Sequence, residues 1–177
     1  MKRILTTGIL SIDKDKFIPC GENNETVINK PQSGTCLWGS TMIKEPGGNV
    51  HSEWSDFTET NYTNACCNYG VSYKLNRSAR IIEIGSSDDY RDIMRTYSCD
   101  RSSLYVDIGQ TSIDFYKLSK DYDAFHLTSD AFWSMRYVDM RKHCYTGFYW
   151  YDCESWIIFN PECINMGSII NHDNVHM

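Results

Sequence analysis

The sequence has no apolar run long enough to cross a bilayer, and it has no excess of positive charge. A transmembrane helix needs about 20 consecutive apolar residues, and no stretch of this chain approaches that length. The opening MKRILTTGILSI is interrupted by Thr6, Thr7 and Gly8 and followed at once by DKDK, which is not typical of a secretory signal. The net charge of −6 disfavours general binding to a nucleic-acid backbone. We expect a cytoplasmic protein with no membrane contact and no bulk nucleic-acid binding.

Familiar catalytic and metal-binding motifs are lacking as well. The sequence contains no phosphate-binding loop, no Gly-x-Ser-x-Gly elbow and no Cys-x-x-Cys pair. Its cysteines lie at positions 20, 36, 66, 67, 99, 144, 153 and 163, a spacing that disfavours a zinc site. We expect reduced thiols and no metal site. An oxidised, secreted protein with disulfides is the alternative.

What is present indicates one globular domain. A chain of 177 residues is long enough for one full core. The hydrophobic fraction of 41% and the aromatic fraction of 14% are typical of folded proteins. We expect a single domain over 1–177, in which 1–34 is an arm or extended lead-in, 35–165 is the core and 166–177 is a tail.

Hydrophobic periodicity predicts an α+β fold. Strands are expected at 36–43, 69–75, 80–84, 104–108, 124–128 and within 147–159, and the strand at 69–75 is expected to be half-buried and to form a hairpin with 80–84. Helices are expected at 52–60, 86–97, 112–120 and 129–137, with N-caps at Ser52, within Ser86-Ser87, and at Ser129 or Asp130. The predicted architecture is a compact mixed-sheet sandwich with three to four short helices.

The segment 147–164, GFYWYDCESWIIFNPECI, is the most informative part of the chain. It places Asp152 and Glu154 two residues apart, directly before an apolar run that Asn160 and Pro161 close. Residues two apart in a strand share a face, so both acids are expected to face one cleft from the mouth of a strand. Two interpretations follow: a catalytic pair of carboxylates, or an edge-strand feature without chemistry.

Three pieces of sequence, in order, resemble the ADP-ribosyltransferase fold. They are LWGST at 37–41, YDAFHLT at 122–128 and the carboxylate that precedes WIIFNPECI. The chain looks more like a group of small phage and prophage proteins with a KP-x-G-x-LW-x-S pattern near the start and an Asp-Cys-acid-Ser motif near the end. The corresponding residues here are KPQSGTCLWGS at 30–40 and DCES at 152–155. This second likeness spans 30–165.

The resemblance to the transferases implies a substrate and roles for particular residues. Glu154 would match the catalytic acid, which hydrogen-bonds a ribose hydroxyl of nicotinamide adenine dinucleotide (NAD) and stabilises the oxocarbenium-like centre as nicotinamide leaves. Asp152 would match the residue that orients the attacking group. The dinucleotide cleft would be lined by Trp38, Ser40 and Thr41, with Tyr149 or Tyr151 stacking on nicotinamide.

The sequence also departs from the transferase pattern. Trp38 and Gly39 stand where the family has a cleft arginine or histidine, and Ala124 stands where glycine is usual. His126 is expected to be a half-buried, hydrogen-bonded imidazole, and the flanking acids are expected to raise the pKa of Cys153. A fold can persist without its activity.

Two functions are therefore expected. The first is an ADP-ribosyltransferase-like phage protein that acts on a host macromolecule or defence system. The alternative is a non-catalytic acidic binding protein that inhibits a bacterial defence complex, with a host protein or protein–nucleic-acid complex as its partner.

Overall fold

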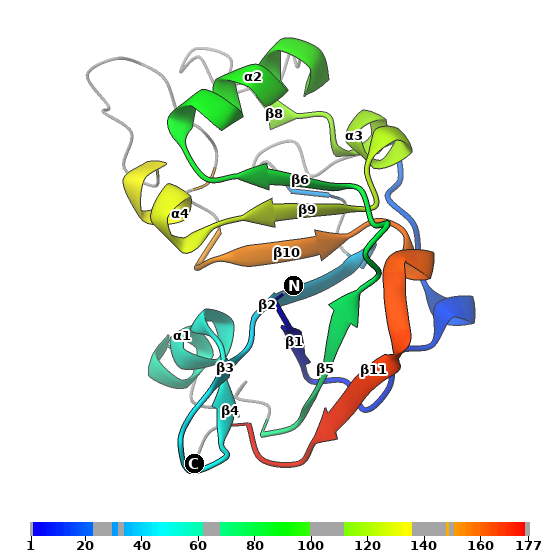
Figure 1. Ribbon diagram of the computed structural model, residues 1–177. Coiled ribbons are helices and arrows are strands. Elements are labelled where there is room, and N and C mark those ends of the chain that lie inside the picture. The colour runs from blue at the N-terminus through cyan, green and yellow to red at the C-terminus, as the bar shows by residue number, and fades with distance from the viewer. Residues whose placement is uncertain are drawn as a thin grey trace.

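A computed structural model describes residues 2–22, 30–31, 34–61, 68–99, 112–135, 148 and 151–175. Over these residues the protein has a mixed α+β fold built on a seven-stranded sheet, with α-helices at one side and one end (Figure 1). The predicted fold class is confirmed at this level. The expected strand at 104–108 lies outside the described residues.

The large sheet runs from edge strand to edge strand in the order β11-β5-β1-β2-β10-β9-β6. The bounds, in that order, are Ile164–His172, Gly70–Leu75, Ile4–Thr7, Leu37–Thr41, Ser155–Ile158, Ala124–Leu127 and Ile81–Ile84. Neighbouring strands are antiparallel except β6 and β9, which are parallel. Two small ladders pair β3 (Ile43–Lys44) with β4 (Val50–His51), and β7 (Ser98–Cys99) with β8 (Ser112–Ile113).

The described helices begin at polar residues that cap their first turns. They are α1 (Glu53–Asn61), α2 (Ser87–Tyr97), α3 (Phe115–Asp121) and α4 (Ser129–Met135). Ser52 caps α1 as predicted, and of the predicted pair Ser86-Ser87 it is Ser86 that caps α2, because each of these side chains accepts a backbone N–H of the first turn. Thr128 caps α4, since its Oγ1 accepts from the Ala131 N–H at 3.2 Å, so the expected caps Ser129 and Asp130 were wrong. The helix expected from 112 begins only after Asp114 because 112–113 form β8.

The two faces of the sheet bury different side chains. Phe125 and Ile157 point to the face that α2, α3 and α4 cover, and they pack in one cluster with Phe132 of α4. Trp156 and Ile158 point to the opposite face and pack in a second cluster with residues of β1, β5 and β11. The alternation follows from the period of two along a strand. Figure 1 shows α1 apart from the other helices, beside β3 and β4.

The predicted hairpin between 69–75 and 80–84 was wrong. The strands β5 and β6 lie far apart in the sheet, with four strands between them, and β6 pairs in parallel with β9. The strand β5 is more buried than expected, because every residue except Lys74 is buried and even Ser72 is inaccessible to solvent. Its hydroxyl is satisfied by His172 Nε2 at 2.7 Å and by Arg3 at 3.2 Å.

The ends of the chain take part in this sheet. The segment 1–34 contributes β1 to the centre of the sheet, where Ile4 and Leu5 are each 1% exposed. The segment 166–177 supplies most of β11, which pairs with β5.

Candidate functional site

A cavity of about 430 Å³ opens where β2 meets the segment that leads into β10. Small-molecule sites have volumes of roughly 300–1,000 Å³, so the size suits a bound metabolite. Its walls include residues from four parts of the chain: Lys30, Trp38, Trp54, Tyr151, Asp152 and Glu154. The structure thus brings both predicted acids and the predicted Trp38 to one cavity.

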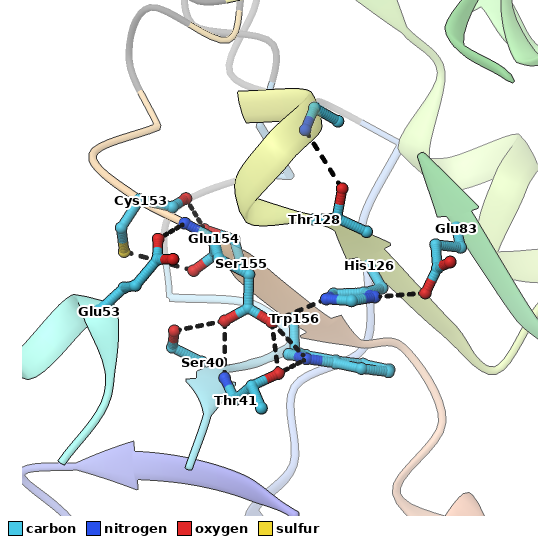
Figure 2. A network of polar contacts seen from close by, with 11 residues as sticks. Ser40, Thr41, Glu53, Glu83, His126, Thr128, Cys153, Glu154, Ser155 and Trp156 are labelled. Carbon is cyan, nitrogen blue, oxygen red and sulfur yellow. Dashed lines mark hydrogen bonds and ion pairs between the residues drawn. The ribbon is translucent and has the colours of Figure 1, made fainter. Parts of the chain in front are cut away.

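The carboxylate of Glu154 is the centre of a dense hydrogen-bond network (Figure 2). Its Oε2 accepts from the Ser40 hydroxyl at 2.5 Å and from the Thr41 N–H at 2.6 Å. Its Oε1 accepts from the Thr41 hydroxyl at 2.5 Å and from Trp156 Nε1 at 3.0 Å, and it lies 2.7 Å from His126 Nε2. The two oxygens of a carboxylate offer about four lone-pair positions, so these five contacts occupy them fully.

The pairing of β10 with β2 positions this carboxylate. Trp156 is opposite Gly39, so Glu154, two residues earlier, reaches the end of β2. Residues 152–154 precede β10 and are not part of a strand, which corrects the expectation that both acids lie on a strand face. A side chain of α1 also holds this segment, because Glu53 accepts the backbone N–H of Glu154 at 3.0 Å.

His126 links Glu154 to the edge of the sheet. Its Nδ1 lies 2.7 Å from Glu83 of β6 and its Nε2 lies 2.7 Å from Glu154, while the ring is completely buried. Trp156 stacks on the imidazole with ring centroids 3.9 Å apart. Carboxylates only accept hydrogen bonds, so both contacts are hydrogen bonds at once when the ring is doubly protonated. His126 is satisfied as predicted, but it is fully buried instead of half-buried, with Trp156 stacked on its ring.

The network keeps Glu154 ionised. Burial alone would raise the pKa of this carboxyl, but the hydrogen bonds from His126, Ser40 and Thr41 outweigh burial and lower the pKa to about 2. Burial raises the pKa of the neighbouring Cys153 thiol, and the charges of Glu53, Glu154 and Asp152 raise it further. Cys153 is therefore no thiolate nucleophile at neutral pH.

The rest of the cavity carries charges that are less completely paired. The ammonium of Lys30 lies 5.7 Å from the ring centroid of Trp38 and 5.1 Å from that of Tyr151. Burial lowers the pKa of Lys30, and the negative charge of Asp152 opposes that effect. Asp152 is half-buried and faces the same cavity.

The other predicted cleft residues have more varied positions. Ser40 is completely buried, and its hydroxyl, like that of Thr41, binds Glu154. Tyr151 is 1% exposed and forms part of the cavity floor beneath Lys30. Tyr149 lies outside the described residues.

Sequence reasoning missed several residues of this region. Lys30, Trp54, Glu53 and Glu83 were not assigned to the site, although all four contact it or its network. A signal existed only for Lys30, which belongs to the KP motif that carries the phage likeness. No such signal existed for the residues of α1 and β6, because their contact with the site depends on how the strands are ordered in the sheet.

Within the described part of the chain, no group of three or more histidine, cysteine and acidic side chains is placed to bind a metal ion. The cysteines at 20, 36, 99, 153 and 163 are free thiols. Over the same residues, none of the helices combines the length and apolar character that a membrane span requires. Comparisons with protein-family models, with curated proteins and with solved structures gave no match.

Proposed function

We propose that this protein is an ADP-ribosyltransferase-like enzyme, of the kind that a phage uses in the host cytoplasm, which modifies a host macromolecule or defence system with NAD as its substrate. The observation that carries the proposal is the shared cavity: Trp38 of β2 and the two acids before β10 line the same hollow. Trp38 belongs to LWGST and Glu154 is the carboxylate before WIIFNPECI, and these are two of the three pieces of sequence that resemble the transferases.

The chemistry assigned to the acids follows from their surroundings. In the transfer, the bond between the ribose C1′ and nicotinamide breaks, the bonding electrons leave with nicotinamide, and positive charge develops on the ribose. The attacking group of the target then donates an electron pair and forms the new bond to C1′. Glu154, whose pKa is about 2, is negative at neutral pH and stabilises that charge. Asp152, half-buried at the cavity wall, orients the attacking group of the target and takes up its proton.

Because every acceptor position of Glu154 is occupied, substrate binding requires an exchange. A ribose hydroxyl takes the place of a protein hydroxyl as donor to the carboxylate. Ser40 and Thr41 are suited to this exchange, since a hydroxyl can rotate to another acceptor or accept a hydrogen bond itself.

The test is transfer of label from NAD to proteins and nucleic acids of a bacterial lysate. The wild-type protein is expected to label a target, and Glu154→Gln and Asp152→Asn are each expected to reduce the rate by at least about 100-fold. Glu162→Gln is the matched control, because this acid is solvent-exposed and forms its ion pair with Lys14. Absence of labelled product, or equal labelling by Glu154→Gln and the wild type, refutes the proposal.

The occupied carboxylate favours a second candidate, a non-catalytic acidic protein that binds and inhibits a host defence complex. Glu154 then serves only to join α1, β2 and β9, and the net charge of −6 directs the protein to a basic surface on its partner. This candidate predicts a stable complex in pull-downs at both low and physiological salt, with no labelled product from NAD.

A further inference from the structure

Lys30 brings a cation into the cavity from outside the sheet. Its ammonium is held over the faces of Trp38 and Tyr151, and it shares the cavity with Asp152. Contact with aromatic faces stabilises an ammonium through the negative potential of the rings. Lysine is rarely buried without a partner, so the surroundings of this group need an explanation.

The paired cations of this protein show what Lys30 lacks. Lys14 lies 2.8 Å from Glu162, and Arg95 lies 2.8 Å from Asp92. Across the residues that the structure places, Lys30 makes no ion pair within 4.0 Å. Asp152 acts on it only as a nearby charge. A half-buried ammonium without a close counter-ion is destabilising unless an anion completes the site.

The remaining walls indicate what carries that anion. Trp38 is half-buried, and Trp54 of α1 is 38% exposed at the same cavity. Indole surfaces bind flat rings by stacking. An ammonium in a cavity that two indoles also line matches a ligand in which a phosphate group lies close to a heterocyclic base. In the transferase pattern the first strand supplies the cation, and here that position is Trp38-Gly39.

We infer that Lys30 binds a phosphate group of the substrate and that the cavity takes a phosphorylated nucleoside, with its base against Trp38 and Trp54. The inference rests on the proposed function and deepens it, because it supplies the dinucleotide anchor that the first strand lacks. The cation reaches the cavity from the segment before β2 and approaches the face of Trp38.

The test is calorimetric binding of ligand pairs that differ only by phosphate: nicotinamide mononucleotide against nicotinamide riboside, and ADP against adenosine. At least one pair is expected to show about tenfold tighter binding of the phosphorylated member, as a charge-assisted hydrogen bond provides. Lys30→Met is expected to reduce that preference to less than about twofold, and Lys30→Arg to retain it. The melting temperature of each variant shows whether it is folded.

The outcomes separate this inference from the proposed function. Equal binding within both wild-type pairs, no binding of any member, or a preference that persists in folded Lys30→Met overturns the inference, even if label is transferred from NAD. A preference that depends on Lys30, together with no transfer of label, supports the nucleotide site and refutes only the transferase.

Discussion

The network around Glu154 and the cavity around Lys30 adjoin one another, yet their charges are partnered to very different degrees. The carboxylate of Glu154 is 6% exposed and has five contacts with nitrogen or hydroxyl groups of the protein. The ammonium of Lys30 has two aromatic faces and a nearby acid, with no close counter-ion among the residues that the structure describes.

This difference indicates that the network around Glu154 holds the structure together and that the cavity around Lys30 binds a ligand. A fully satisfied polar network in the interior makes an arrangement rigid and specific. Here it joins β2, β9, β10 and, through Glu53, the helix α1. Incompletely paired groups in a cavity are available to a ligand. Glu154 belongs to both regions, because it is the centre of the hydrogen-bond network and also part of the cavity wall.

The largest expected effect comes from breaking the satisfied network. Glu154→Ala leaves His126 and four other donor contacts without their acceptor, which is expected to reduce the free energy of unfolding by about 3–5 kcal/mol. Asp152→Ala changes a half-buried residue of the cavity wall and is expected to lower the free energy of unfolding by less than about 1 kcal/mol. Urea denaturation measures both. If Glu154→Ala and Asp152→Ala lower the free energy of unfolding equally, the network is no more important for stability than the cavity wall.

Acid should weaken the same network. The pKa of Glu154 is 4.5 in the unfolded chain and about 2 in the folded protein, a difference worth roughly 3 kcal/mol. Since the folded-state pKa is the lower one, the contribution is complete above pH 4.5, declines as the pH falls and is lost below pH 2. Urea unfolding between pH 5 and pH 2 measures this decline, and Glu154→Gln should show a decline smaller by a similar amount.

Packing between β1 and β2 gives a third, smaller effect. A Cβ atom at Gly39 would lie 2.6 Å from Ile4 Cγ2 and 2.9 Å from the Leu5 carbonyl oxygen. Gly39→Ala is therefore expected to cost about 1–3 kcal/mol by overpacking, and to displace the end of β2 that holds Glu154. Gly47→Ala is the matched control, because no atom lies within 4 Å of its added Cβ. If Gly39→Ala leaves the free energy of unfolding unchanged, β1 can move away without cost and the prediction is wrong.

The smallest expected effect comes from changing Glu83, the partner of His126 at the edge strand β6. Glu83 and Glu154 bind opposite nitrogens of His126 at 2.7 Å each, but their side chains are 57% and 6% exposed. Glu83→Gln is therefore expected to cost less than about 1 kcal/mol, since water replaces part of the lost interaction. Urea denaturation of Glu83→Gln and Glu154→Gln compares the exposed and the buried partner of His126. A larger loss of unfolding free energy for Glu83→Gln than for Glu154→Gln would contradict the prediction.

Local patterns were sufficient for most elements and for part of the site. The helices α1 and α2 begin where helix starts were predicted, and β2 and β9 lie in segments expected to be strands. The cavity contacts of Trp38, Asp152 and Glu154 were also predicted, because β10 was expected to carry the acids into a cleft opposite the early strand. The roles in NAD chemistry stay predictions.

Partners from distant strands could not be predicted in this way. The local alternation of 69–75 and 80–84 fits a hairpin, and nothing in these residues specifies that β6 pairs with β9 instead. That choice places Glu83 against His126, and so determines how the buried imidazole is satisfied. Lys30 likewise reaches Trp38 only through the course of the chain before β2.

The sequence by itself determined the α+β class, the caps of two helices and the placement of two acids directly before a buried strand, because each depends on interactions between residues close along the chain. Only the tertiary structure decided which donors surround Glu154 and which cation enters the cavity. Those contacts join residues from separate strands and loops, and their pairing follows from sheet order, which is set by the packing of the whole core.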